Sequence, residues 1–123
     1  MRVENVNAPT VMLGKQAPER DVDALTKQAA AVSDIYAARF GINRDATWYL
    51  AKLTEELGEM QSAYLATQGA QRRAPSQAEA RQNLIDETAD LFGFLMVFAE
   101  WQDIDLAAAF AAKWGRYLSD KGE

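Results

Sequence analysis

The sequence predicts an all-α protein built as a bundle of four to five helices. Long segments repeat apolar residues at three- and four-residue steps, and Gly, Pro, Ser and Asp punctuate them where helices begin and end. No segment shows the alternating pattern of a strand. With 123 residues, of which 49% are hydrophobic, the chain is long enough for a single packed core.

The first helix is expected from Glu19 to about Phe40, because Ala-rich sequence there carries apolar residues at helical spacing. Gly41 follows and can adopt the left-handed conformation that often ends a helix. Residues 1–18 contain two prolines and no sustained period, so they are predicted to form an irregular lead-in. The helical domain should then span residues 19–119.

A second helix should begin after Asp45 or Thr47, either of which can cap it, and fade near Gly69. Its apolar stripe consists of Leu50, Leu53, Leu57, Met60 and Tyr64.

A third helix should follow the polar linker around Pro75, because Ser76 and the glutamate three residues later form a capping-box pattern. This helix is predicted to reach about Gln102, and its apolar residues cover most of its circumference, which is typical of a central helix. Asp103 or Asp105 can cap a last helix that runs through Tyr117.

Composition excludes several functions. There is no cysteine and no histidine, so thiolate chemistry, Ser-His-Asp triads and histidine metal ligands are all absent. The formal net charge of −5 argues against binding to nucleic acid or to an anionic membrane. No signal-peptide pattern opens the chain and no apolar run reaches the roughly 18 residues of a membrane span, so we expect a cytoplasmic protein.

Carboxylates are concentrated in two of the predicted helices. Glu56 and Glu59 stand three residues apart in the second helix, directly after Glu55, and Glu87 and Asp90 repeat the spacing in the third. Residues three apart share a helix face. Two such faces together would form a cage of hard oxygen ligands, which suits Mg²⁺ or Mn²⁺ and, through the metal, a substrate phosphate.

Glu87 is the most informative of these carboxylates. A helical projection places it within the apolar sector of the third helix, where an unpaired carboxylate costs several kcal/mol. A bound metal would resolve that conflict. The alternative interpretation is a pair of solvated acidic faces with local ion pairs such as that between Lys52 and Glu56.

The two motifs, Glu55-Glu56-Leu57-Gly58-Glu59 and Glu87-Thr88-Ala89-Asp90, resemble those of a known family. These are the all-α nucleoside triphosphate pyrophosphohydrolases of the MazG-like group, which includes dimeric dUTPases and dCTP pyrophosphatases. The resemblance covers roughly residues 45–117.

The resemblance implies hydrolysis of a nucleoside triphosphate between its α- and β-phosphates, as house-cleaning of non-canonical or excess nucleotides. By the same resemblance Glu56, Glu59, Glu87 and Asp90 would hold Mg²⁺, with Mn²⁺ as a possible substitute, and Glu55 or Glu56 would orient or deprotonate the attacking water. It further implies a homodimer or homotetramer with active sites near the subunit contacts.

Four further residues are candidates for substrate binding. Lys113 and Arg116 resemble the basic pair of the family's last helix, although cations near a helix C-terminus are also favourable on their own. Asn83 lies one turn before Glu87 and could equally be a simple support for it. Trp48 is a candidate for base recognition, together with the aromatic residues Phe40, Tyr49 and Phe94, although most aromatics at helical spacing belong to the core.

Two other functions remain open from the sequence. One is a non-catalytic helical dimer that binds a partner or regulates it. The other is a different metal-dependent phosphohydrolase, such as one that cleaves a nucleotide-derived second messenger or a phosphoribosyl nucleotide of histidine biosynthesis.

Overall fold

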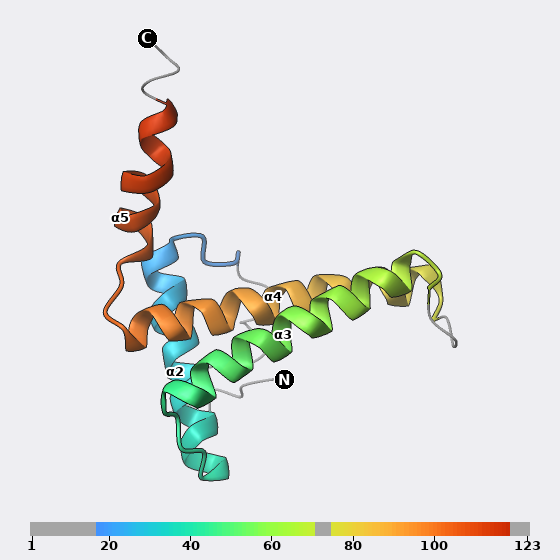
Figure 1. The fold of residues 1–123 in the computed structure, drawn as a ribbon, viewed down its shortest axis with the longest axis horizontal. Coiled ribbons are helices and arrows are strands. Elements are labelled where there is room, and N and C mark those ends of the chain that lie inside the picture. The colour runs from blue at the N-terminus through green and yellow to red at the C-terminus, as the bar shows by residue number, and fades with distance from the viewer. Residues whose placement is uncertain (1–16, 71–74, 119–123) are drawn as a thin grey trace.

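The computed structural model describes residues 17–70 and 75–118, and all regular structure within these ranges is helical. The elements are α2 (Val22–Phe40), α3 (Ala46–Thr67), α4 (Gln77–Trp101), α5 (Leu106–Phe110) and the π-helix η1 (Ala111–Gly115). Most of the expected lead-in, residues 1–16, lies outside the described residues. Figure 1 shows α3 and α4 as a long antiparallel hairpin, with α2 crossing it at the end remote from the α3–α4 connection.

The helix boundaries follow from local capping. Asp21, Asp45 and Asp105 each accept a hydrogen bond from a backbone N–H in the first turn of the helix that they precede. The first helix therefore starts at Val22 and not at the expected Glu19. At its other end Gly41 has φ 61°, the left-handed conformation predicted for this stop.

The predicted capping box is present at the start of α4. The Ser76 hydroxyl oxygen accepts a hydrogen bond of 3.1 Å from the backbone N–H of Glu79. In return, the Glu79 carboxylate accepts one of 3.0 Å from the backbone N–H of Ser76. Two N–H groups that lack partners inside the helix are satisfied in this way.

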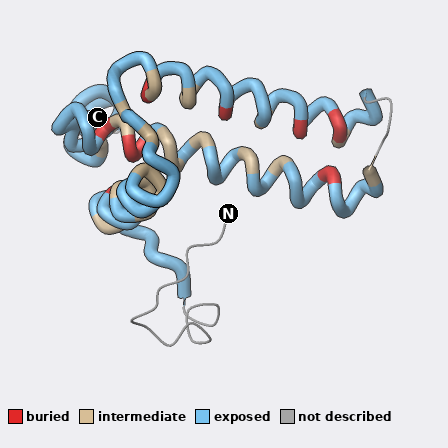
Figure 2. The backbone as a smooth tube through the Cα atoms, turned by 90° about the horizontal axis from the view of Figure 1, so that it is seen from below, coloured by how far each residue is buried: buried red, intermediate tan, exposed pale blue. Residues whose placement is uncertain are grey.

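The core is small and lies where α3 faces α4, as the buried positions in Figure 2 show. Ala63, Ala66 and Ala80 are among its buried residues, and their small side chains allow the two backbones to approach closely. At the α2 end of the hairpin, the ring of Tyr49 stacks on Trp101 with centroids 4.1 Å apart. The two long helices are thus held together along their length.

The prediction that the third helix is central is not met within one chain. Ile85, Phe92 and Leu95 on α4 are 43–46% exposed, because α2 and α3 are the elements that pack closely against this helix within residues 17–70 and 75–118. Apolar residues of α3, among them Leu50 and Tyr64, are exposed as well. The described part of one chain therefore does not close the bundle.

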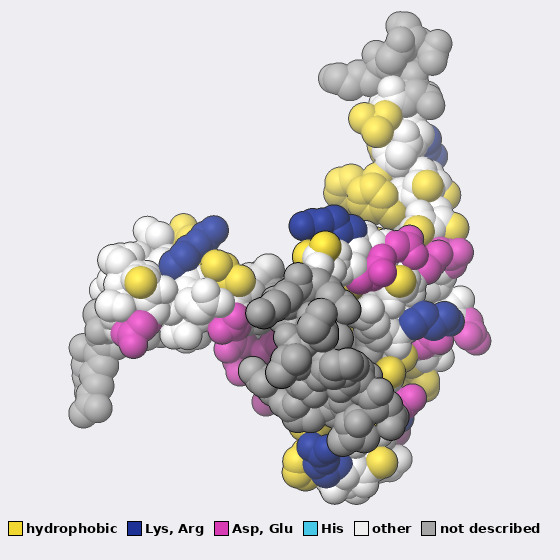
Figure 3. Space-filling view, turned by 180° about the vertical axis from the view of Figure 1, so that it is seen from behind, with side chains coloured by type: hydrophobic (Ala, Val, Ile, Leu, Met, Phe, Trp, Pro, Cys, Tyr) yellow, Lys and Arg dark blue, Asp and Glu magenta, His cyan; other side chains and the backbone are white. Residues whose placement is uncertain are grey.

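The last helix departs from the expected α-helix. After one short α-helical segment, α5, the backbone forms the π-helix η1 and then a further helical turn. The rings of Phe110 and Trp114 stack with centroids 5.7 Å apart, and both side chains are more than 60% exposed. The whole segment extends away from the α3–α4 hairpin (Figure 1), and Figure 3 shows apolar side chains along this arm.

Among the described residues, no helix combines the length and the apolar character that are needed to cross a bilayer.

We predict that Ser76→Ala lowers the free energy of unfolding by about 1 kcal/mol, because it removes one half of the capping box at the start of α4. Thermal unfolding should show a midpoint lower by roughly 4 °C. Gln77→Ala, an exposed change one residue further along, is the matched control and should have little effect. Equal midpoints for the two variants would contradict this role of Ser76.

Candidate active site

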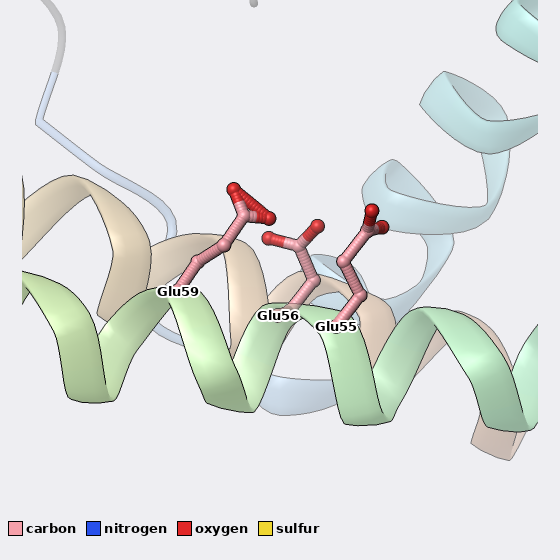
Figure 4. Close-up of side chains that lie close together, drawn as sticks. All are labelled: Glu55, Glu56 and Glu59. Carbon is pink, nitrogen blue, oxygen red and sulfur yellow. The ribbon is translucent and has the colours of Figure 1, made fainter.

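Three glutamates on α3 project from one side of that helix. Glu55, Glu56 and Glu59 point toward the same region in Figure 4, and one carboxylate oxygen of each lies within 4.8 Å of the others. Glu56 is buried, with 5% of its surface exposed, whereas Glu55 and Glu59 are exposed. The buried member of the set lies between its two more accessible neighbours.

Helix α4 adds two more carboxylates to this cluster. Oxygens of Glu87 and Asp90 lie within 4.8 Å of one another and of an oxygen of Glu56. Because α3 and α4 run antiparallel and pack together, the middle of one helix faces the middle of the other. Glu56 therefore belongs to both groups, and all five predicted carboxylates gather around it.

The crowding changes proton affinities in the cluster. Burial raises the pKa of Glu56 above its ordinary value, and the charge of Glu59 adds to the effect while Lys52 opposes it. Burial also raises the pKa of Glu87, followed by the negative charges of Glu59 and Asp90. Both groups hold their protons more tightly than a free glutamate does.

Lys52 is the cation beside the cluster. Its ammonium donates a hydrogen bond of 2.7 Å to the Glu55 carboxylate and lies 3.8 Å from a carboxylate oxygen of Glu56. The same nitrogen sits 5.0 Å from the centroid of the Phe94 ring. Burial lowers the pKa of Lys52, but the hydrogen bond to Glu55 and the surrounding carboxylates outweigh burial and raise it.

A divalent cation fits this arrangement. The Glu87 Oε1 atom is buried and has no hydrogen-bond partner. Within residues 17–70 and 75–118, neither Glu59 nor Glu87 nor Asp90 takes part in an ion pair. A hard-oxygen metal site has two such features. One is a buried carboxylate oxygen without a hydrogen-bond donor, and the other is a group of carboxylates with a single ammonium beside it.

A cavity of about 530 Å³ adjoins the carboxylate cluster. It lies between α2, α3 and α4, and both Lys52 and Asp90 line it. The base-recognition candidates Trp48 and Phe94 also line it, with ring centroids 6.1 Å apart.

The basic candidates for substrate binding lie elsewhere in this chain. Lys113 and Arg116 belong to the arm that extends away from the hairpin (Figure 1), where the Arg116 guanidinium donates a hydrogen bond to the hydroxyl of Tyr117. Asn83 is exposed on α4. The structure therefore does not bring this basic pair to the carboxylates of its own chain.

Of the remaining aromatic candidates, Phe40 is 62% exposed at the end of α2 and Tyr49 is buried against Trp101.

Two residues of this region were not singled out from the sequence as functional. The sequence predicts Lys52 only as an ion-pair partner of Glu56. Its spacing of three and four residues before Glu55 and Glu56 is the signal that links it to the carboxylates. Arg44, which also lines the cavity, lies in a loop with no periodic pattern to place it.

The helical hairpin and its shared carboxylate cluster define an all-α protein of the MazG-like, nucleoside triphosphate pyrophosphohydrolase type, as the two motifs predicted. The chain belongs to the phosphoribosyl-ATP pyrophosphohydrolase family, whose profile matches residues 23–112. This is a family of metal-dependent pyrophosphohydrolases, which supports assignment of the chain as a hydrolase. No curated protein and no solved structure gives a significant match.

We predict that a divalent metal stabilises the protein more at pH 8 than at pH 5. The pKa values of Glu56 and Glu87 are raised in the folded chain, so protonation of these two groups stabilises the fold. This stabilisation is complete below pH 4.5, the ordinary pKa, and is lost as the pH rises through the raised pKa values. Metal binds the deprotonated carboxylates and should restore that loss, by about 2.7 kcal/mol at a hundredfold excess over Kd.

Thermal unfolding in EDTA, Mg²⁺ or Mn²⁺ across this pH range measures the effect. Glu87→Gln removes one of the two raised groups and should shrink the metal-dependent increment. An increment that is equal at both pH values would count against a metal at these carboxylates.

Proposed function

We propose that this protein is a Mg²⁺-dependent nucleoside triphosphate pyrophosphohydrolase that releases pyrophosphate and the nucleoside monophosphate. The observation that carries the proposal is the meeting of five carboxylates around Glu56, with a buried Glu87 oxygen that has no partner, in a chain of a pyrophosphohydrolase family. House-cleaning of non-canonical or excess nucleotides is the corresponding role.

Glu56, Glu59, Glu87 and Asp90 are the residues that would hold Mg²⁺, or Mn²⁺ in its place. When bound, the metal would neutralise triphosphate charge and lower the pKa of a coordinated water. The donor set supports this assignment because all four ligands are carboxylates, which Mg²⁺ and Mn²⁺ prefer.

Glu55 or Glu56 would orient the attacking water and accept its proton. Glu55 suits this role because it is exposed and lies outside the trio formed by Glu56, Glu87 and Asp90. Its hydrogen bond to Lys52 fixes the direction of its carboxylate. Water would attack phosphorus, the bond from that phosphorus to the bridging oxygen would break, and pyrophosphate would leave with the electron pair. In a chain without histidine, a carboxylate is the available base.

Phosphate contacts from Lys113 and Arg116 would come from a second copy of the chain. The arm that carries them extends away from the carboxylates, and apolar residues remain exposed on α3, on α4 and on the arm itself. Burial of such faces between subunits is the usual way in which they are covered. We therefore propose a homodimer or homotetramer, and no nucleic-acid or membrane partner.

The family description favours phosphoribosyl-ATP as a second candidate substrate. Its hydrolysis would use the same carboxylates and release the same pyrophosphate. A non-catalytic helical dimer is disfavoured, because a solvated acidic surface gives no reason for the buried and unpartnered oxygen of Glu87.

We predict metal-dependent pyrophosphate release from a panel of canonical and modified NTPs and dNTPs. Release should occur with Mg²⁺ or Mn²⁺, should be matched by the monophosphate, and should stop in EDTA. Phosphoribosyl-ATP belongs in the same panel. If the folded, metal-loaded protein cleaves none of these compounds, the proposed reaction is wrong.

We predict that Glu59→Ala and Glu87→Gln each lower kcat by roughly 100-fold or more, because each removes a carboxylate that would hold the metal. Circular dichroism and the oligomeric state should stay unchanged. Glu100→Gln, an exposed carboxylate more than three turns further along α4, is the control and should keep full activity. Full activity in either site variant would overturn the site assignment.

A further inference from the structure

The five carboxylates of the cluster differ in how they are paired. Glu55 accepts a hydrogen bond of 2.7 Å from the Lys52 ammonium through its Oε1 atom. A carboxylate oxygen of Glu56 lies 3.8 Å from the same nitrogen, which is beyond hydrogen-bond distance. Within residues 17–70 and 75–118, no ion pair reaches the other three carboxylates. Glu55 is therefore the member of the cluster that has a hydrogen-bonded cation.

The Lys52 ammonium is held in place from two sides. Lys52 stands one turn before Glu55 on α3, so the two side chains share a helix face. Its nitrogen also lies 5.0 Å from the centroid of the Phe94 ring on α4, which is a cation–π distance. The Lys52 side chain is 30% exposed, whereas that of Lys27, in its surface ion pair with Glu100, is 75% exposed. The pair of Lys52 and Glu55 is therefore better shielded from solvent than an ordinary surface pair.

Glu55 is close enough to its neighbours to become a metal ligand. One of its oxygens lies within 4.8 Å of oxygens of Glu56 and Glu59, so a single cation could contact all three. A carboxylate that gives its lone pairs to a metal has little capacity left to accept a proton from water. Lys52 occupies Oε1 by its hydrogen bond and leaves Oε2 of Glu55 for a water molecule. Its positive charge also repels a cation from this side of the cluster.

We propose that Lys52 is a positioning residue that keeps Glu55 out of the metal's coordination shell and so reserves Glu55 as the proton acceptor for the attacking water. This inference rests on the proposed function and assigns a role to a residue outside the two carboxylate motifs. The four other carboxylates of the cluster then hold the metal alone. One ammonium thus divides the cluster into metal ligands and a base.

Lys52→Met tests this role, because Met keeps an unbranched chain of similar length but removes the ammonium. We expect Mg²⁺ and Mn²⁺ to bind this variant about tenfold more tightly, since Glu55 becomes free to bind the metal and a nearby positive charge is lost. We expect kcat for NTPs to fall about tenfold, because the base is drawn onto the metal. Titration calorimetry without nucleotide measures the first effect, and pyrophosphate release measures the second. Damage to the fold would weaken metal binding, so a tighter affinity separates the proposed role from a structural one.

Two single variants serve as controls. Lys52→Arg keeps a charged donor and should recover at least part of the kcat that Lys52→Met loses. Lys27→Met removes a lysine from the exposed pair with Glu100 and should leave both the metal affinity and kcat unchanged.

A double variant, Lys52→Met with Glu55→Gln, separates this role from a direct contact between Lys52 and the substrate phosphates. It removes both charges of the pair and keeps the four other carboxylates, so its metal affinity should return to within about threefold of the unaltered chain. Its kcat should be no lower than that of Glu55→Gln alone, because Lys52 acts through Glu55.

Weaker or unchanged metal binding in Lys52→Met would overturn the proposal, and so would a kcat in the double variant that reflects two independent losses. Absence of metal binding in the unaltered chain would remove both the metal site and this role of Lys52. If metal binds and no nucleotide is hydrolysed, the proposed function fails. Calorimetry on the single and double variants still decides whether Lys52 keeps Glu55 away from the metal.

Discussion

The packing of α3 against α4 is the interaction on which the candidate site depends. Buried alanines between the two helices allow a close approach, and the antiparallel arrangement sets Glu56 opposite Glu87 and Asp90. That approach gathers like charges and buries Glu56, which opposes folding unless protons or a cation compensate. Apolar contact between the helices therefore stabilises an arrangement that the carboxylates alone would disfavour. The repulsion that remains between the carboxylates would be relieved by a bound cation, and for this reason the cluster suits a metal.

Lys52 connects the two halves of the site. One ammonium is bonded to Glu55, lies near Glu56 and rests over the ring of Phe94, which belongs to the neighbouring cavity. It therefore lies at the boundary between the carboxylate cluster and the aromatic side chains of the cavity. In the same cavity Arg44 donates a hydrogen bond of 2.9 Å to the carboxylate of Asp34.

The uncovered apolar surface sets a second constraint. Helix α4 carries apolar residues around most of its circumference, yet in the described part of the chain only α2 and α3 pack closely against it. The exposed ring stack of Phe110 and Trp114 lies on an arm that also carries Lys113 and Arg116. A homo-oligomer would cover the apolar faces. The same association would bring Lys113 and Arg116 of one copy to the carboxylates of another.

Local sequence determined the helices and the carboxylate motifs. The aspartate caps, the capping box at Ser76 and the left-handed Gly41 act over a few residues, so they could be read directly from the chain. The three-residue spacing of the glutamates likewise fixed which of them share a helix face.

Tertiary structure decided what no local pattern carries. It made Glu56, rather than Glu87, the most buried carboxylate, because burial depends on the facing helix. It joined Arg44 and Lys52 in one cavity, and it turned the arm with Lys113 and Arg116 away from the site. These outcomes depend on the crossing of helices that are distant in sequence, and side-chain periodicity within one helix holds no information about that crossing.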